Sequence, residues 1–214
     1  MPADLRPFAA SLGLTLTQAQ HDQLAAYAAC VWAKKDFLNL TSVGDETEIF
    51  TRHLADGLVA AAKIQAICRV KQLQRITLAD VGAGAGYIGF TLAAALPFAQ
   101  VTLVESLEKR CRFMNWAALQ SHIPVHIKQA RLGQGKTQTF DFVTERAMGQ
   151  LPDILAICME AVSPNGFFIA FQGEHPQAQD CKLPQNTILL GVENYKLPLS
   201  DNKKRHLVLF GKNK

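Results

Sequence analysis

The chain has 214 residues, of which 49% are hydrophobic and 19% are charged, and this ordinary globular composition excludes a disordered or fibrous protein. A chain of this length buries roughly 70% of the surface that its unfolded form exposes, so it needs neither disulfides nor a metal ion to be stable. The net charge of +4 suits a polyanionic partner but is equally typical of a solvated surface, so charge alone does not identify the partner.

Residues 1–75 show helical patterns and few strand signals. Apolar residues recur at three- and four-residue spacing after Thr17 and predict a helix that places Trp32 in the core. A second helix is predicted to begin at Asp45, because acidic side chains are favoured in a first helical turn. On that helix His53 and Asp56 lie three residues apart, and we interpret them as a buried pair that satisfy each other.

From residue 76 on, strands alternate with helices. The predicted strands are 76–80, 100–105, 125–128, 140–144, 167–172, 187–192 and 206–210, and the predicted helices are 87–96, 107–120 and 150–162. This alternation indicates parallel strands joined by right-handed crossovers. The last two strands are joined by a loop and are predicted to pair antiparallel. We therefore predict an α/β fold in which a helical N-terminal extension (1–75) precedes a seven-stranded, mostly parallel sheet with an antiparallel C-terminal hairpin (76–214). This arrangement is more typical of a methyltransferase than of a dehydrogenase.

The strongest local signal is the run D-V-G-A-G-A-G-Y-I-G at 80–89, which follows an apolar strand and begins a helix. A tight strand-to-helix turn requires positive φ, which glycine adopts readily, and a Cβ there would block the approach of a ligand. Glu105 ends the next strand, where its carboxylate is placed to accept hydrogen bonds from two ribose hydroxyls. The run therefore predicts a cofactor that contains a nucleoside.

Two cofactors fit this run. Gly84, Gly86 and Gly89 match the dinucleotide fingerprint, in which a helix N-terminus holds the pyrophosphate. Asp80 favours a different ligand, because its charge would repel a pyrophosphate but suits S-adenosylmethionine (SAM), which has an amino group and a sulfonium and no phosphate. We therefore predict SAM on the class I, Rossmann-like methyltransferase fold, with a dinucleotide-dependent dehydrogenase as an alternative.

Several separate stretches together resemble one family, RsmG (also called GidB), the bacterial 16S (small-subunit) ribosomal RNA guanine-N7 methyltransferases. The stretches are N-L-T-S-V at 39–43, R-H-L-A-D-G-L at 52–58, the glycine run at 80–89, the segment 101–113, T-E-R-A at 144–147 and R-H-L-V at 205–208. They occur in the family's order and span nearly the whole chain. The chain departs from the family pattern at four places, with Tyr87-Ile88 for Phe-Pro, Gly133 for glutamate, Glu145 for serine and Gln172 for lysine.

The resemblance implies site residues and partners. The implied SAM site is formed by Gly82, Gly84, Gly86 and Tyr87, with Glu105 on the ribose, Leu132 and Gly133 framing the adenine, and Arg146 beside the transferred methyl group. The implied substrate is small-subunit rRNA or the ribosomal subunit. The proposed RNA phosphate contacts are Lys109, Arg110, Arg112, Lys203, Lys204 and Arg205.

The residue types agree with methylation at guanine N7. This nitrogen presents a lone pair and carries no proton, so its attack on the sulfonium methyl needs no general base and catalysis is mostly positioning. Arg146 is the candidate for positioning the guanine edge or the methionine carboxylate, although it is also interpretable as a surface residue paired with Glu145. A SAM enzyme for another RNA or a small molecule, and a catalytically weak SAM- or RNA-binding module, remain as alternatives.

The remaining features predict absences. The five cysteines are odd in number, form no C-x-x-C pair and have no histidine at ligand spacing, which predicts reduced thiols, no metal site and a cytoplasmic location. The apolar run near 90–98 is too short for a membrane span, and the N-terminus lacks the pattern of a secretory signal. We predict a monomer, with Trp116 in the core beside its apolar helical neighbours.

Overall fold

The computed structural model describes residues 3–38, 44–134, 138–198 and 204–214. Its N-terminal part is helical, with α1 (Arg6–Ser11), α2 (Gln18–Leu38), the short α3 (Glu46–Glu48), a π-helical stretch η1 (Ile49–Leu54) and α4 (Ala55–Lys71). The Asp45 side chain accepts a hydrogen bond from the Thr47 N–H at 2.9 Å and caps α3, which is why this helix begins where its acidic residues predict. The segment 39–43 of the family resemblance lies outside the described residues.

Seven strands form one sheet in the order β3-β2-β1-β4-β5-β7-β6. Their bounds are β1 (Ile76–Val81), β2 (Ala99–Glu105), β3 (His126–Gln129), β4 (Phe140–Arg146), β5 (Val162–Gln172), β6 (Thr187–Tyr195) and β7 (Arg205–Lys212). The pairings among β1 to β5 are all parallel, whereas β7 runs antiparallel to both β5 and β6. The predicted parallel sheet with an antiparallel C-terminal hairpin is confirmed.

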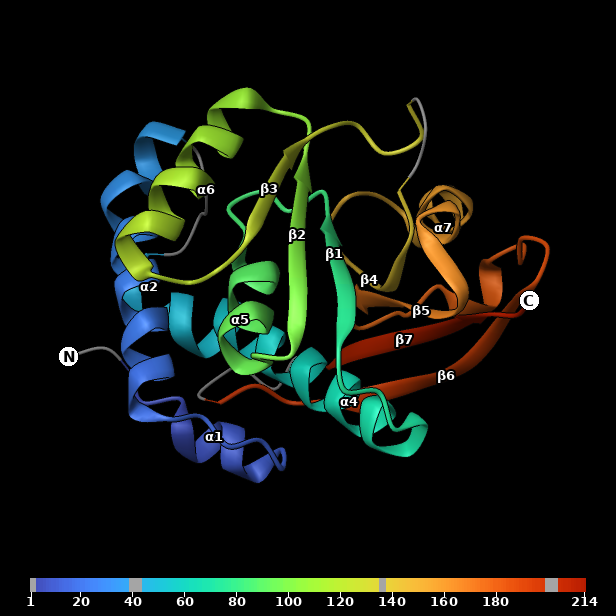
Figure 1. The fold of residues 1–214 in the computed structure, drawn as a ribbon, viewed down its shortest axis with the longest axis horizontal. Coiled ribbons are helices and arrows are strands. Elements are labelled where there is room, and N and C mark those ends of the chain that lie inside the picture. The colour runs from blue at the N-terminus through green and yellow to red at the C-terminus, as the bar shows by residue number, and fades with distance from the viewer. Residues whose placement is uncertain (1–2, 39–43, 135–137, 199–203) are drawn as a thin grey trace.

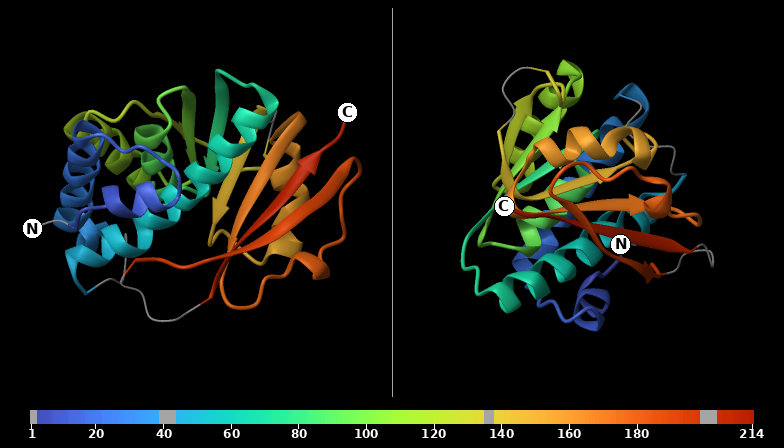
Figure 2. Two further views of the ribbon diagram at one scale, coloured as in Figure 1. Left: turned by 90° about the horizontal axis from the view of Figure 1, so that it is seen from below. Right: turned by 90° about the vertical axis from the view of Figure 1, so that its right-hand side faces the viewer.

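Helices cover the two faces of the sheet unequally (Figures 1 and 2). One buried cluster joins β-strand side chains such as Phe142 to α1, α2, α4, α5 (Tyr87–Ala95) and α6 (Glu108–Ser121). The opposite cluster joins the next residue of the same strand, Val143, to α7 (Leu151–Glu160) and the short 3₁₀ helix η2 (Ala178–Asp180). Full burial of one such side chain contributes roughly 1.5–3 kcal/mol. The first cluster contains residues from both sides of position 75, so the N-terminal helices share a core with the sheet.

The sheet topology brings distant residues to one edge. Strands β1, β4 and β5 are parallel, so their last residues, Val81, Arg146 and Gln172, all lie at the carboxyl edge of the sheet. Because β7 is antiparallel, its first residue, Arg205, lies at this carboxyl edge, and Tyr195 at the end of β6 pairs with it. Ligands of open α/β sheets bind at this edge, and the candidate site is found there.

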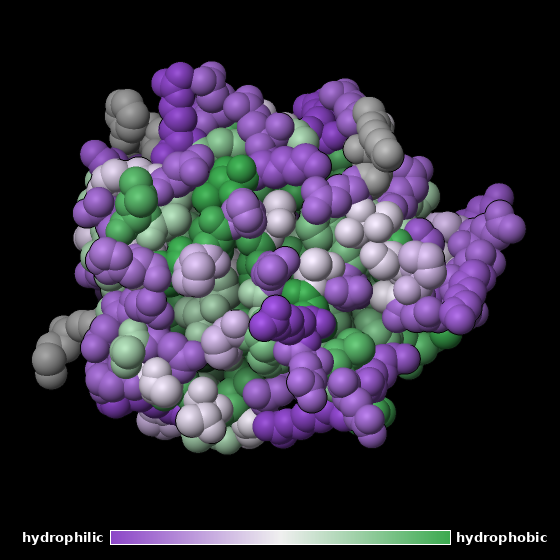
Figure 3. Space-filling model, in the orientation of Figure 1, coloured by the Kyte–Doolittle hydropathy of each residue, from purple (hydrophilic) through white to green (hydrophobic). Residues whose placement is uncertain are grey.

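The surface agrees with a globular chain, but one side chain that was predicted to be buried, Trp116, is exposed. Figure 3 shows hydrophilic side chains around the rim of one face, with hydrophobic and intermediate ones between them toward its centre. No helix within the described ranges is long and apolar enough to span a membrane. Trp116 was predicted to be buried, but it is 37% exposed, and the Lys34 ammonium lies over its ring at 5.8 Å. The prediction is wrong because helical spacing does not say which side of α6 faces the sheet. Trp32 is partly buried against the core.

Candidate functional site

The loop between β1 and α5 has a backbone that only glycine adopts without strain. Gly82, Gly84 and Gly86 have φ values of 63°, 61° and 92°, all in the left-handed region. At Gly86 a Cβ would also come within 2.8 Å of Leu103 and Phe90. The buried Tyr27 hydroxyl donates to the Ala85 carbonyl at 2.8 Å, so α2 helps to fix the loop. The result is a curve of backbone that lines a cavity, where a ligand can approach it closely.

Asp80 lies directly below this loop. Its Oδ2 accepts a hydrogen bond from the Gly89 N–H at 2.9 Å, and its Oδ1 accepts one from the Thr144 hydroxyl at 3.0 Å. Burial raises the pKa of Asp80 from 3.8 to about 6, although these two bonds and the nearby Arg146 oppose the rise. Asp80 lines a cavity together with the glycine loop and Arg146, and it provides a negative centre at the point where β1 ends.

Glu105 fixes the other end of the same groove. Its Oε2 accepts from the Gly84 N–H at 2.9 Å, and its Oε1 accepts from the Leu107 N–H at 2.9 Å. The side chain is buried, but it lines a cavity of about 580 Å³. Each oxygen also has a second, longer contact: the Ser106 hydroxyl donates to Oε1 at 3.3 Å, and Arg110 Nη1 donates to Oε2 at 3.4 Å. The glycine loop and the strand-end acid that the sequence singled out are therefore joined by a direct bond.

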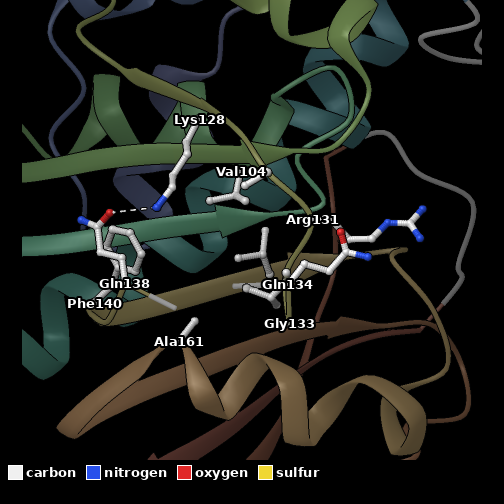
Figure 4. A pocket seen from close by; sticks show the side chains of 11 residues that line it. Val104, Lys128, Arg131, Gly133, Gln134, Gln138, Phe140 and Ala161 are labelled. Carbon is white, nitrogen blue, oxygen red and sulfur yellow. Dashed lines mark hydrogen bonds between the residues drawn. The ribbon is translucent and has the colours of Figure 1, made fainter. Parts of the chain in front are cut away.

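The two cavities form one groove, because Gly82, Arg110 and Ala147 line both. Leu132 also lines the groove beside Glu105. Gly133, predicted with it, lines a smaller neighbouring cavity of about 80 Å³ under the end of α7. Figure 4 shows Gly133 in that cavity with Val104 and Phe140.

Arg110 lies in the groove, although the sequence suggested a role on the RNA-facing surface. Its Nη1 lies 3.4 Å from Glu105 Oε2, and its buried Nε has no hydrogen-bond acceptor among the described residues. Two other residues were predicted with Arg110 as RNA phosphate contacts. Lys109 is exposed, and Arg112 is exposed and paired with Glu108 at 2.5 Å. In the tail cluster, Lys204 is exposed, Arg205 is half-buried and Lys203 lies outside the described residues.

A second, more basic cavity adjoins the groove at the carboxyl edge of the sheet. It has a volume of about 600 Å³ and shares Arg146 and Ala147 with the cavity of the glycine loop. Its walls contain three arginines, Arg52, Arg146 and Arg205, besides Phe171 and Gln172. Ala147 lies where the basic cavity meets both cavities of the groove and has a φ of 64°, an uncommon value for a residue with a side chain.

A buried carboxylate connects the walls of this basic cavity. Asp56, 1% exposed, accepts from Arg146 Nη1 at 2.9 Å and from Arg205 Nη1 at 3.2 Å, both through Oδ2. Its Oδ1 accepts from the Tyr195 hydroxyl at 2.7 Å. Burial and the neighbouring Asp56 carboxylate raise the pKa of Tyr195 well above its usual value, which keeps Tyr195 a donor. We refer to these four residues as the Asp56 cluster.

The Asp56 cluster corrects two predictions. His53 was interpreted as the partner of Asp56, but its ring stacks on Tyr87 with a centroid distance of 4.3 Å. Burial, with the charges of Arg146 and two other arginines, lowers the pKa of His53 to about 3, so the ring is neutral. The alternative that Arg146 pairs with Glu145 is also wrong, because Arg146 bonds to Asp56.

Glu145 lies on the other side of the sheet from Arg146. Consecutive strand residues point to opposite faces, so Glu145 faces α7 while Arg146 faces α4. Glu145 is 1% exposed, its Oε1 accepts from the Met148 N–H at 2.5 Å, and its Oε2 has no partner among the described residues. Burial, with the nearby Asp80 charge, raises the pKa of Glu145 to about 7.

Four features together define the class of protein. They are the strand order with its antiparallel β7, the left-handed glycine loop, the acid at the end of β2 and a second cavity beside the loop. The fold is that of the class I SAM-dependent methyltransferases. Two solved structures support the fold: a Listeria monocytogenes protein described as a class I S-adenosylmethionine-dependent methyltransferase (TM-score 0.65, 11% identity, 92% of this chain and 69% of that chain), and magnesium protoporphyrin IX methyltransferase from Synechocystis PCC 6803 with bound SAH (TM-score 0.61, 10% identity, 90% and 100%).

The sequence comparison identifies the family. Residues 20–208 match the GidB family model, described as rRNA small subunit methyltransferase G. The chain is 34% identical over 189 residues to the ribosomal RNA small subunit methyltransferase G of Polaromonas naphthalenivorans, covering 88% of this chain and 86% of that protein. The chain therefore belongs to the GidB family of SAM-dependent methyltransferases. The dinucleotide-dependent dehydrogenase is no longer an alternative.

Sequence reasoning missed the non-local part of the site. Tyr195 was not singled out, Thr144 was named only as part of the T-E-R-A stretch, and Asp56 was given a different partner. The spacing of Arg52 and Asp56 in the family stretch at 52–58 would have suggested a pair one helical turn apart, but Arg52 bonds to Glu48 instead. No local pattern indicates that Arg205, 149 residues further on, binds the same carboxylate.

Proposed function

We propose that the protein transfers the methyl group of SAM to N7 of a guanine in small-subunit ribosomal RNA. One observation carries this proposal: a groove built on the glycine loop and Glu105 meets a basic cavity at Arg146 and Ala147. A cofactor on one side of this junction and a polyanionic acceptor on the other would meet there. The family's description as an rRNA small subunit methyltransferase agrees with this division.

The groove fits SAM through residues of this chain. Gly84 leaves open space where a Cβ would otherwise stand, while Gly82 and Gly86 let the loop pack closely on Met148 and on Leu103 and Phe90. We propose that Glu105 accepts from the ribose hydroxyls, that Asp80 faces the positive amino group and sulfonium, and that Leu132 with Gly133 frames the adenine. SAM supplies an electrophilic methyl group on its sulfur. Tyr87 and Arg146 close the groove toward the acceptor, with the Arg146 guanidinium 5.4 Å from the centre of the Tyr87 ring.

The chemistry of the junction suits an acceptor that needs no base. Asp80 is held by Gly89 and Thr144, and Asp56 is held by two arginines and a tyrosine, so both nearby aspartates are engaged. His53 is a very weak base, because its pKa lies near 3. Guanine N7 offers its own lone pair, and positioning alone can lower such a barrier by roughly 7–11 kcal/mol. Arg146 is suited to this role because a guanidinium can bond to O6 and N7 together.

The RNA substrate sets the wider context. We propose that Lys109, Arg112, Lys203 and Lys204 contact RNA phosphates outside the cavity, while Arg205 contacts RNA from the cavity wall. We further propose that the protein acts as a monomer in the cytoplasm, where ribosomal subunits are found. The division into a helical extension (1–75) and a methyltransferase core (76–214) remains a proposal about function, in which the extension completes the acceptor side.

The decisive experiment measures methyl transfer directly. The purified protein, isotopically labelled SAM and unmodified small-subunit particles or their deproteinised RNA are incubated together, and the RNA is digested to nucleosides. We expect label in 7-methylguanosine. The Arg146→Gln variant should lose most of this activity, while Arg69→Gln, an exposed arginine of α4 outside the site, should retain it.

The other outcomes separate the alternatives. Label in a different nucleoside would keep the enzyme class and refute the guanine-N7 assignment. Tight SAM binding without label on either substrate form would favour a binding module over an enzyme for this rRNA. Equal activity of both arginine variants would remove Arg146 from the mechanism.

A further inference from the structure

The Asp56 cluster has a feature that positioning of SAM does not require. Two guanidinium groups bond to the same carboxylate oxygen, at 2.9 Å and 3.2 Å. Two like charges this close would repel each other without the carboxylate between them. The cluster therefore holds a surplus of one positive charge at the wall of the basic cavity.

We propose that Arg146 and Arg205 form a binding site for one backbone phosphate of the target RNA strand, and that Asp56 and Tyr195 are the positioning residues that hold it together. This inference rests on the proposed function. The two Nη1 atoms are at most about 6 Å apart, a separation that one phosphate can bridge with two oxygens through charge-assisted bonds.

The geometry of Asp56 explains how the site is oriented. Tyr195 donates to Oδ1 and so fixes the rotation of the carboxylate, which leaves Oδ2 directed at both arginines. Each guanidinium has five N–H groups and uses one Nη1 on Asp56, while both arginines also line the basic cavity. The side chains of Arg146 and Arg205 remain 21% and 23% exposed, enough for contact with a ligand in that cavity.

The SAM carboxylate is the competing anion, and the cavity walls favour the phosphate. Arg146 lines both the groove of the glycine loop and the basic cavity, whereas Arg205 lines only the basic cavity. An anion that contacts both arginines therefore lies on the acceptor side. A phosphate held there would place its nucleotide next to Ala147, at the entrance to the groove.

The test compares variants that break the cluster with a matched control. Asp56→Asn and Tyr195→Phe remove its anchors, and Arg205→Gln removes one arm. The control is Glu193→Gln, which breaks the Lys63–Glu193 pair, another polar link between α4 and β6, without touching the cavity. For each variant we measure kcat and KM for the rRNA substrate, SAM affinity by calorimetry, RNA affinity as a function of salt, and the melting temperature.

We expect Asp56→Asn to raise the KM for RNA at least tenfold and Tyr195→Phe about threefold, with SAM affinity unchanged within twofold. For Arg205→Gln the slope of log K against log salt should fall by about 0.7–0.9, the loss of one phosphate contact. Glu193→Gln should match the wild type. If Asp56→Asn fails to fold, Tyr195→Phe and Arg205→Lys take its place, because Arg205→Lys keeps the charge. These two variants then decide whether the cluster holds a phosphate site for RNA.

Two results would overturn the inference. Weakened SAM affinity with an unchanged KM for RNA would assign the arginines to the SAM carboxylate. Cluster variants that behave like Glu193→Gln would leave the cluster with a structural role alone. If the wild-type protein forms no 7-methylguanosine, the proposed function fails, but the salt dependence of RNA binding still tests the phosphate site.

Discussion

Glu145 gives a quantitative prediction, because its carboxyl group is buried without a positive partner. Its pKa rises from 4.5 to about 7, chiefly through burial. Each tenfold change in proton affinity is worth about 1.4 kcal/mol, so ionising Glu145 in the folded protein costs about 3 kcal/mol. Between these pKa values the unfolded chain is ionised and the folded chain keeps its proton, so stability contributed by Glu145 falls as pH rises from 4.5 to 7.

The Glu145→Gln variant isolates this effect. Glutamine has the same shape, and its amide oxygen can still accept from the Met148 N–H, but it does not ionise. The wild-type curve also contains the opposite contribution of His53, whose lowered pKa favours folding as pH rises toward 6.5. The difference between variant and wild type cancels His53 and every other unchanged group.

The assay is urea unfolding of both proteins at several pH values. We expect the stability advantage of Glu145→Gln over wild type to grow by about 2–3 kcal/mol between pH 5 and pH 8. Asp80→Asn is not a suitable control, because Asp80 lies in the groove. A difference that stays constant with pH would show that Glu145 is already ionised in the folded protein, and the argument from burial would be refuted.

Three further predictions concern the groove and the core. Glu105→Gln should weaken SAM binding about tenfold to a hundredfold, as expected for the loss of charge-assisted hydrogen bonds worth roughly 1.5–3 kcal/mol, and calorimetry measures this. Gly84→Ala should destabilise the fold by about 1 kcal/mol, because its φ is 61° although the space around it is open. Gly44→Ala, at a glycine without positive φ, should not destabilise the fold, and thermal melts compare the two variants. Burial raises the pKa of Cys68 to about 11 and that of Cys158 still further, so both thiols should resist a thiol reagent at pH 8 until denaturant is added, and rapid labelling of either would contradict their burial.

The parts of the structure that the sequence predicts well are those with local causes. The seven strands follow from runs of apolar residues, and their observed bounds differ from the predicted ones by a few residues, most at the start of β5. The loop at 80–89 is predictable because its glycines, the strand before it and the helix after it are adjacent in sequence. Glu105 follows from the same pattern, since it ends the next parallel strand.

The parts that the sequence did not predict depend on how elements are oriented in space. Trp116 has a helical neighbourhood that looks apolar, but only the packing of α6 determines that its ring is exposed. Arg110 looks like part of a surface charge run, yet the first turns of α6 direct it at Glu105. Asp56 has a nearby histidine, and its actual partners come from strands that are far away in sequence.

The two halves of the site also differ in how much of the chain each one needs. The glycine loop and Glu105 lie within one strand–helix–strand unit and are joined by a bond between residues 21 positions apart, although Tyr27 and Thr144 support the unit from further away. The Asp56 cluster joins residues 90, 139 and 149 positions apart. Opening of the β6–β7 hairpin would break the Asp56 cluster, whereas no described residue of this hairpin lines the cavities of the glycine loop. A preparation that binds SAM fully can therefore contain inactive molecules, and only turnover reports that the whole chain is folded.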